Sequence, residues 1–291
     1  MLYSILDMEQ IFKLKPNLTE ATKRTYSQTF KRVVKYFDKP IETVTVDEML
    51  VSIDDMIGRG ENINTVKAFL NMCILFRQSI GNDTDKLIEK RDGLNSILNQ
   101  HVKDKKKEKA EKLVDFKTLE LNMEKEYDDG NWRNYIVQYL FLCFAFRNKD
   151  VNMKVVKFTK DTLADKSINY IVTNILNGIK LVINDYKTAS TYGQKVIMIR
   201  DKKFIKVTRT FLKGKTWLLT DKDKPLKDES LATRIRDFTY ERNTESNYFK
   251  AILIHANSLP HTTTLLKEYS KSRGTDINTI LNSYDCDEKS I

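Results

Sequence analysis

The chain has 291 residues, 41% hydrophobic and 31% charged, which suits a soluble globular protein of one large or two compact domains. With only 9 glycines and 4 prolines, the composition argues against collagen-like or long disordered chains and favours helices. The net charge of +10 makes a polyanion such as DNA or RNA the expected partner.

The cysteines and the apolar runs indicate which cellular compartment to expect. Cys73, Cys143 and Cys286 have neither metal-ligand spacing nor the pattern of a disulfide framework. We therefore expect an intracellular, reducing location, cytoplasmic or nuclear, and no secretion. The longest apolar run, Tyr135–Phe146, is too short to span a bilayer and predicts a buried helix that places Cys143 in the core. No membrane partner is expected.

The first hundred residues predict a helical domain, because apolar residues recur at helical spacing. Pro40 ends the first of these helices, and Gly58-Arg59-Gly60 closes the second. The predicted helices lie within Asn17–Phe37, Asp47–Ile57, a stretch capped by Asn64, and Asp83–Gln100.

A basic linker is expected at residues 101–114. His101–Lys112 holds six lysines among twelve residues and almost no apolar side chains. Such a segment is either a solvated connector or a stretch that lies along a phosphate backbone, and the sequence leaves both readings open.

Residues 115–291 combine helices with strands. Two β-branched runs, Tyr170–Leu176 and Ile179–Asp185, flank Asn177-Gly178, the strongest short signal for a hairpin. Lys195–Arg200 predicts a third strand. The fold class expected is mainly α with a small antiparallel three-stranded sheet (α+β), as a two-domain clamp able to close round a duplex. Helices are predicted at Phe116–Lys125, Trp132–Phe146, Phe204–Leu212, Ser230–Arg242, Tyr248–Ser258 and Thr264–Arg273.

The order of several motifs resembles the tyrosine recombinase (phage integrase) family over nearly the whole chain. The motifs are the Thr-x-x-Thr-Tyr stretch ending at Tyr26, Phe144-Ala-Phe-Arg147-Asn-Lys-Asp150-Val151, Tyr186-Lys187-Thr188, and Trp217-Leu-Leu-Thr-Asp with Pro225-Leu226. The resemblance implies a helical core-binding (DNA-clamp) domain at 1–100 and a catalytic domain at 115–291.

The resemblance also implies a chemistry. Members of the family cleave and rejoin double-stranded DNA through a 3′-phosphotyrosyl intermediate, without metal or cofactor, as a tetramer on DNA. Arg147 would bind the scissile phosphate with its forked donors, and Asp150 would orient Arg147. Lys187, in the expected hairpin turn, would protonate the leaving 5′ oxygen.

The C-terminal motifs carry the rest of the implied site. Tyr284 lies ten residues past Gly274, the family spacing for the nucleophile. Thr275 stands where the family has a histidine, and Asn247-x-x-Lys250 stands in place of His-x-x-Arg. Lysine keeps the charge but loses bidentate phosphate binding, which Arg273 would compensate. His255 and His261 are out of register.

Four functions follow from these patterns. The first is a site-specific recombinase or integrase, of viral or mobile-element origin if the richness in Lys, Asn and Ile reflects an AT-rich genome. The altered second box favours a catalytically degenerate DNA-binding relative. A type IB topoisomerase would relax supercoils as a monomer. A helical interaction protein unrelated to DNA would lack salt-dependent duplex binding.

Overall fold

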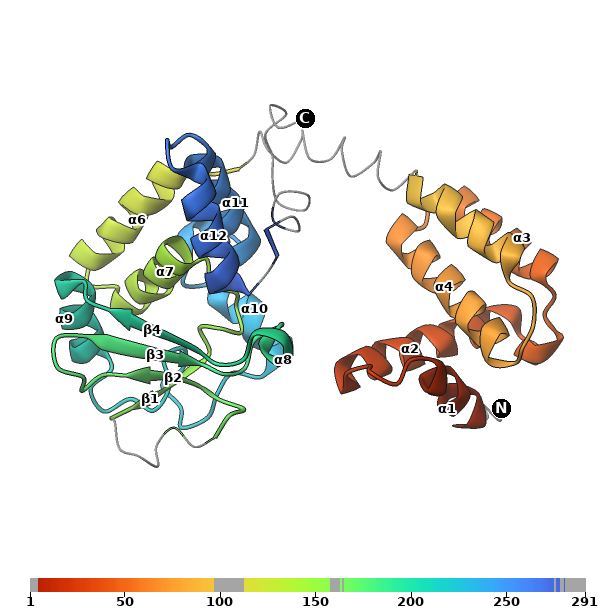
Figure 1. Ribbon diagram of the computed structural model, residues 1–291, viewed down its shortest axis with the longest axis horizontal. Helices are drawn as coiled ribbons and strands as arrows, with labels where there is room; N and C mark the ends of the chain where they lie inside the picture. The colour runs from red at the N-terminus through yellow and green to blue at the C-terminus, as the bar shows by residue number, and fades with distance from the viewer. Residues whose placement is uncertain are drawn as a thin grey trace. The chain divides into compact units, whose positions relative to one another are not determined.

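In a computed structural model the chain divides into two compact units, residues 1–107 and 108–291 (Figure 1). The structure describes residues 5–96, 113–157, 163, 165–274, 276, 277 and 280. Most of the expected linker, residues 101–112, lies outside the described part. No helix within the described part is both long and apolar enough to cross a membrane.

Unit 1 is helical, with α4 at its centre, since α4 packs against α1, α2 and α3. Its core is mainly apolar, and Phe69 and Leu70 of α4 are almost completely buried within it. Cys73 is buried there too. The elements are α1 (Ile5–Leu14), α2 (Glu20–Phe37), the 3-10 turn η1 (Ile41–Thr43), α3 (Val46–Gly58), α4 (Ile63–Ser79) and a helix over residues 85–96.

Side-chain caps explain where these helices begin. The hydroxyl of Thr19 accepts from the backbone N–H of Thr22, and Thr45 forms a capping box with Glu48 at the start of α3. The expectation that Asn64 caps the third helix was wrong. Asn62 is the cap, because its side chain accepts from the backbone N–H of Asn64, and the helix therefore begins two residues earlier than predicted, at Ile63.

Unit 2 holds a sheet and a group of helices. The helical elements are α6 (Phe116–Asp128), α7 (Trp132–Phe144), α8 (Ala189–Tyr192), α9 (Lys202–Phe211), α10 (Asp228–Arg236), the 3-10 turn η2 (Tyr240–Arg242), α11 (Glu245–Asn257) and α12 (Thr262–Arg273). The strands are β1 (Met153–Val156), β2 (Asn169–Val172), β3 (Ile179–Ile183) and β4 (Lys195–Ile199).

The sheet corrects the sequence prediction. It has four strands in the order β1-β2-β3-β4 and is mixed, because β1 runs parallel to β2 whereas the other pairs are antiparallel. The expected two-residue turn was also wrong. β2 ends at Val172 and β3 begins at Ile179, and the side chain of Leu176 between them is 88% exposed. Asn177 does adopt the left-handed conformation, at φ 55°.

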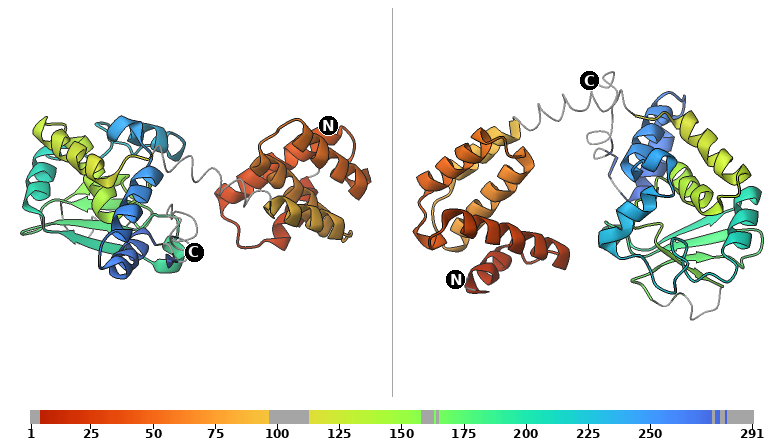
Figure 2. Two further views of the ribbon diagram at one scale, coloured as in Figure 1. Left: turned by 90° about the horizontal axis from the view of Figure 1, so that it is seen from above. Right: turned by 180° about the vertical axis from the view of Figure 1, so that it is seen from behind.

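One face of the sheet packs on the helices. Ile171, Leu181 and Ile197 share this face, because both isoleucines pair with Leu181, and they pack with the helices in a single core. Figure 2 shows the helices gathered on one side of the strands in two further views. Lys195 pairs with Ile183, two residues along from Leu181, and therefore faces the same helix-covered side.

Cys143 departs from its predicted position. The sequence placed it in the core of the apolar run, but its side chain is exposed near the end of α7. Its neighbours Phe141 and Leu142 are buried, so the helix turns Cys143 away from the core.

Candidate active site

Three of the residues chosen from the sequence, Arg147, Asp150 and Arg273, meet at one corner of unit 2, beside the ends of α7 and α12 and the start of β4. At this corner α7 stops because Ala145 adopts a left-handed conformation (φ 52°) and donates its N–H to the carbonyl of Phe141. The chain then turns, with Phe146 buried, so that the side chain of Arg147 leaves the apolar core at a fixed position. Arg147 itself is half-buried.

Arg147 and Arg273 hold two helix ends together reciprocally. The Nη1 of Arg147 donates to the carbonyl of Arg273 at 2.9 Å, at the end of α12. In return, the Nη1 of Arg273 donates to the carbonyl of Ala145 at 3.1 Å, at the end of α7. Both guanidinium groups thus satisfy carbonyls that a helix end leaves without an intrahelical partner. The corner has a rigid backbone frame as a result.

Glu245 supplies the negative charge that Arg273 needs. Arg273 is 1% exposed, and its Nη2 donates to Oε1 of Glu245 at 2.9 Å. The other oxygen, Oε2, accepts from the backbone N–H of Asn148 at 2.5 Å. The guanidinium carbon also lies 4.1 Å from the ring centroid of Phe249, one helical turn after Glu245 on α11. A buried arginine is tolerated here because it is paired and hydrogen-bonded.

Lys195 brings a third cation to the corner. Its Nζ donates to the carbonyl of Ser272 at 2.8 Å and lies 3.5 Å from the ring centroid of Tyr186. Burial lowers the pKa of Lys195 to about 8, with the charges of Arg147 and Arg273 acting in the same direction. A lysine with such a pKa is a capable proton donor near neutral pH.

Asp150 lies beneath these cations and is fully buried. Its Oδ2 accepts from the backbone N–H of Arg147 at 3.0 Å, which closes the turn that carries the arginine. Its Oδ1 is buried and has no hydrogen-bond partner in the described part of the chain. Burial raises the pKa of Asp150 to about 6, although the charges of Lys195 and Arg147 oppose that shift.

Gly274 allows the β3–β4 connection to approach the end of α12. Its φ of 58° favours glycine, and a Cβ there would lie 2.7 Å from Oγ1 of Thr188 and 2.8 Å from the ring of Tyr186. The hydroxyl of Thr188 donates to the carbonyl of Gly274. A larger residue at position 274 would strain the backbone and force the side chains of Thr188 and Tyr186 to shift.

A groove of about 1000 Å³ opens beside the corner. Lys195 and Ser272 line it on the corner's side, and Tyr192, Val196 and Met198 line it from α8 and β4. Lys195 thus reaches a space that another molecule can enter. Among the described residues, no group of three His, Cys, Asp or Glu side chains is arranged to hold a metal ion.

The structure brings together some of the residues chosen from the sequence and separates others. Arg147, Asp150 and Arg273 meet at the corner. Lys187 is exposed in the turn before α8 and makes no hydrogen bond or ion pair with another described residue. Thr275 and Tyr284 lie outside the described residues.

The substitute second box, Asn247-x-x-Lys250, is not part of the corner. The amide of Asn247 donates to the side chain of Asn243, in the turn before α11. Lys250 lies five residues after Glu245, about 140° further round the helix, and makes no ion pair with a described carboxylate. His255 also lies elsewhere, stacked on Phe116 at 4.3 Å.

Sequence reasoning missed Lys195 and Glu245. The signal for Lys195 is its position in a strand whose alternate residues Ile197 and Ile199 face the core, since a lysine in that register is forced inward. The signal for Glu245 is weaker: an acidic residue at the first position of a helix whose N-cap is Thr244.

The chain is similar to known proteins in structure but matches none in sequence. No protein-family model and no curated protein sequence matches the chain. Among solved structures, the chain is similar to the crystal structure of XerA recombinase, with a TM-score of 0.39 and 9% sequence identity. The similarity covers 97% of this chain and 94% of that one.

Proposed function

We propose that the protein binds double-stranded DNA and cleaves and rejoins it through a 3′-phosphotyrosyl intermediate, as a site-specific recombinase. The observation that carries the proposal is the convergence of Arg147, Lys195 and Arg273 at one rigid corner, beside a groove that Lys195 lines. Cations held at fixed positions are what a phosphodiester needs when charge grows on its oxygens. Unit 1 would supply further contacts to the duplex.

The proposed reaction assigns each group one task. The phenolate oxygen of Tyr284 attacks phosphorus, and the bond from phosphorus to the 5′ oxygen breaks. Arg147 stabilises the charge on the non-bridging oxygens. Arg273 is too buried for this contact and acts as a positioning residue, through the carbonyl that receives the Arg147 hydrogen bond. The 5′ hydroxyl of the cleaved strand attacks in the reverse step, which rejoins the DNA and frees the tyrosine.

Lys195 is the lysine that we assign as proton donor, in place of Lys187. Both lie near the β3–β4 connection, but only Lys195 has its Nζ held against the corner, by the carbonyl of Ser272 and the ring of Tyr186. Its pKa of about 8 leaves a transferable proton near neutral pH. The exposed Lys187 would contribute a phosphate contact at most.

A second candidate is a DNA-binding relative that has lost cleavage. It is favoured by one observation: Arg273, the second arginine at the corner, is 1% exposed and engaged by Glu245. A single half-buried arginine would then face the phosphate. Binding would survive in such a protein, because affinity for a duplex comes mainly from backbone charge.

The deciding experiment uses supercoiled plasmid with EDTA present, followed by SDS and a gel that resolves protein-linked nicks. We expect a covalent adduct from the wild-type chain and none from Tyr284→Phe, with equal duplex binding by both. Binding without an adduct would establish the degenerate relative. Steady relaxation at protein concentrations where the chain is monomeric would identify a type IB topoisomerase instead.

A further inference from the structure

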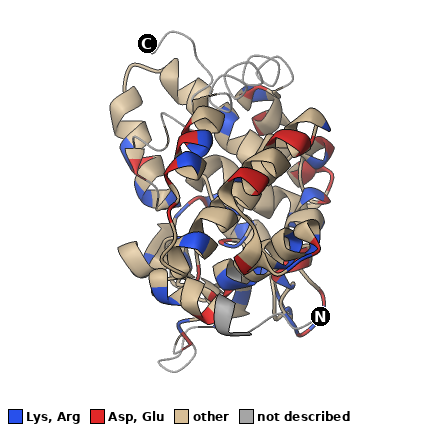
Figure 3. Ribbon diagram, turned by 90° about the vertical axis from the view of Figure 1, so that its right-hand side faces the viewer, with Lys and Arg blue, Asp and Glu red and all other residues tan. Residues whose placement is uncertain are grey.

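Net charge alone does not locate a binding surface on this protein, because lysines, arginines, aspartates and glutamates intersperse along the ribbon in Figure 3. Unit 1 nevertheless separates the two signs by helix. α2 carries five basic residues against one acidic residue, Glu20. α3 carries four acidic residues and no basic residue. The ion pairs of these two helices decide which of the charges remain available on the surface.

Neighbouring basic side chains neutralise the acidic residues of α3. Each of the four carboxylates has a cationic partner, and the pairs are exposed, so they affect where charge lies more than they affect stability. The pairs are Asp47 with Lys86, Glu48 with Lys39, Asp54 with Lys90, and Asp55 with Arg59.

A stripe on α2 is formed by Arg24, Gln28, Lys31 and Lys35. Its positive charge is not neutralised by ion pairs with described carboxylates. The spacings of four, three and four residues place these side chains within about 60° of one another on the helix, along about 16 Å of its axis. All four are exposed. The opposite side of α2, with Phe30 and Val33, is buried in the core of unit 1.

The stripe is the part of α2 whose cations form no ion pair within the described part of the chain. Lys23 pairs with Glu20, and Arg32 pairs with Glu61. No described carboxylate forms an ion pair with Arg24, Lys31 or Lys35.

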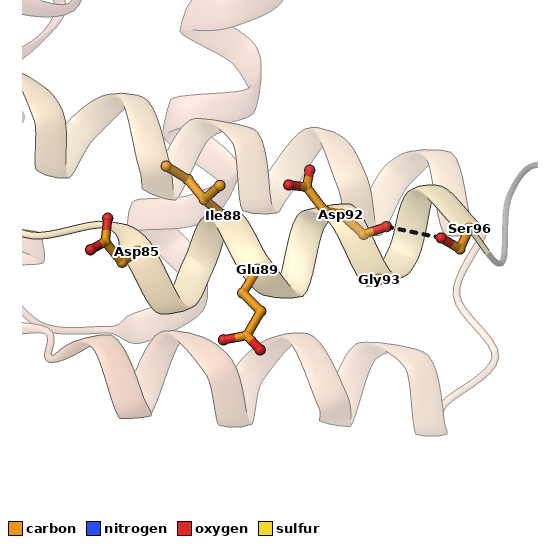
Figure 4. A pocket seen from close by; sticks show the side chains of 6 residues that line it. All are labelled: Asp85, Ile88, Glu89, Asp92, Gly93 and Ser96. Atoms are coloured by element: carbon orange, nitrogen blue, oxygen red, sulfur yellow. Dashed lines mark hydrogen bonds between the residues drawn. The ribbon is translucent and has the colours of Figure 1, made fainter.

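Another surface of unit 1 has the opposite character. A shallow hollow on the helix of residues 85–96 presents the carboxylates of Asp85, Glu89 and Asp92, as Figure 4 shows. The carboxylate of Asp92 pairs with Arg91 at 2.9 Å, and the hydroxyl of Ser96 donates to the carbonyl of Asp92. Asp85 and Glu89 form no ion pair with a described residue, so the hollow stays negative. A phosphate would be repelled there, so the hollow is not a candidate for a nucleic-acid site.

We propose that the stripe Arg24–Gln28–Lys31–Lys35 lies along the phosphate backbone of the duplex, as the surface by which unit 1 binds DNA. This inference rests on the proposed function. Lys31 and Lys35 are separated by about 6 Å along the helix axis, a spacing that lets each neutralise a different phosphate. The amide of Gln28, which lies between Arg24 and Lys31 along the helix, can donate a further hydrogen bond to a phosphate. Contacts of this kind position the protein without reading base sequence.

A membrane surface is the other polyanion that a basic helix can bind. Helices that bind membranes insert an apolar face beside their basic residues. In α2 the apolar face is already occupied by the core of unit 1, where Phe30 and Val33 are buried. Charge without an accessible apolar face favours the duplex.

The test compares two triple variants of the full chain that lose the same charge from the same unit. Arg24→Ala, Lys31→Ala and Lys35→Ala together remove the stripe. The matched control, Lys39→Ala, Lys86→Ala and Lys90→Ala, removes three partners of α3. Fluorescence anisotropy of a labelled 30-base-pair duplex is measured over a series of NaCl concentrations. Circular dichroism checks that both variants remain folded.

We expect the stripe variant to bind about 10- to 100-fold more weakly near 0.1 M salt, with the slope of log affinity against log salt reduced by about 2 to 3. The control should keep the wild-type slope. Equal losses in both variants, or an unchanged slope in the stripe variant, would overturn the inference while leaving the proposed function intact. A wild-type chain that fails to bind the duplex would overturn both. Loss of binding to phosphatidylserine vesicles, with duplex binding retained, would assign the stripe to membranes instead.

Discussion

The cations of the two units differ in how far they are exposed to solvent. On α2 of unit 1, Arg24, Lys31 and Lys35 are exposed and carry their charge into solvent. At the corner of unit 2, Arg273 is buried against Glu245, and Lys195 is held by a carbonyl and an aromatic ring. The exposed cations of α2 can attract a polyanion from solution, whereas the cations of the corner can act only on a group that is already bound beside them.

This difference separates affinity from chemistry. Exposed cations are hydrated, so their contribution to DNA affinity depends on how many of them contact phosphates, and salt weakens it. Arg273 and Lys195 at the corner are held by fixed partners, and burial lowers the pKa of Lys195 to about 8. Mutations in the two regions should therefore be distinguishable by what they change.

The largest effect is expected from Lys195→Ala. If Lys195 protonates the leaving oxygen, its loss should slow strand cleavage about 100- to 10,000-fold while duplex binding changes little. Single-turnover formation of the covalent adduct measures the rate, and anisotropy measures binding. Lys187→Ala is the matched control, since it removes an exposed lysine eight positions earlier in the same connection.

The assignment of Lys195 as proton donor would be wrong if Lys187→Ala abolished cleavage and Lys195→Ala did not. The corner would then be a structural frame, and the exposed turn would carry the chemistry. Substrates with a sulfur at the leaving 5′ position sharpen the result, because a leaving thiolate needs no proton. Such a substrate should restore the rate of Lys195→Ala if that residue is the proton donor.

A smaller effect, on stability, is expected from Glu245→Gln. The substitution keeps the shape of the side chain but leaves the buried Arg273 without a countercharge, which should lower the free energy of unfolding by about 3 kcal/mol. Urea unfolding followed by tryptophan fluorescence measures it cleanly. Both tryptophans, Trp132 and Trp217, lie in unit 2.

Glu124→Gln is the control for that measurement. Glu124 pairs with Lys203 in the same unit, but the two side chains are 45% and 34% exposed. Removing an exposed pair should cost less than about 1 kcal/mol. Equal losses in the two variants would mean that the corner is as well hydrated as the surface, contrary to the contrast drawn between them.

Local signals in the sequence predicted most helices, because caps and apolar spacing act within a few residues. The arginine turn was predictable for the same reason, since Asp150 lies three residues from Arg147 and accepts its N–H. The strand β1 was not. Its four residues gain their place from parallel pairing with β2, across a crossover that no local pattern reveals.

The remaining errors at the site have a similar origin. The burial of Lys195 follows from strand register opposite Ile183, a partner that sequence spacing does not fix. The pattern Asn247-x-x-Lys250 selected Lys250, whereas α11 brings Glu245 to the corner. In both cases the residue type was visible in the sequence, but the face on which it lies was decided by tertiary packing.

The smallest predicted effect concerns the pH dependence of stability through Asp150. Burial raises its pKa from the usual 3.8 to about 6, so the folded protein holds this proton more tightly than the unfolded chain. The contribution of Asp150 to stability is therefore greatest below about pH 4 and is lost as the pH rises through about 6. The loss should amount to about 2 to 3 kcal/mol.

Asp150→Asn isolates this contribution, because the amide can still accept the N–H of Arg147 but does not titrate. Other carboxylates change stability over the same range, so the informative quantity is the difference in unfolding free energy between variant and wild type. That difference should move in favour of the variant by about 2 to 3 kcal/mol between pH 4 and pH 7. A constant difference would show that Asp150 titrates like an exposed carboxylate. Water would then reach the corner, and the proposed difference in hydration between the corner and the α2 stripe would be wrong.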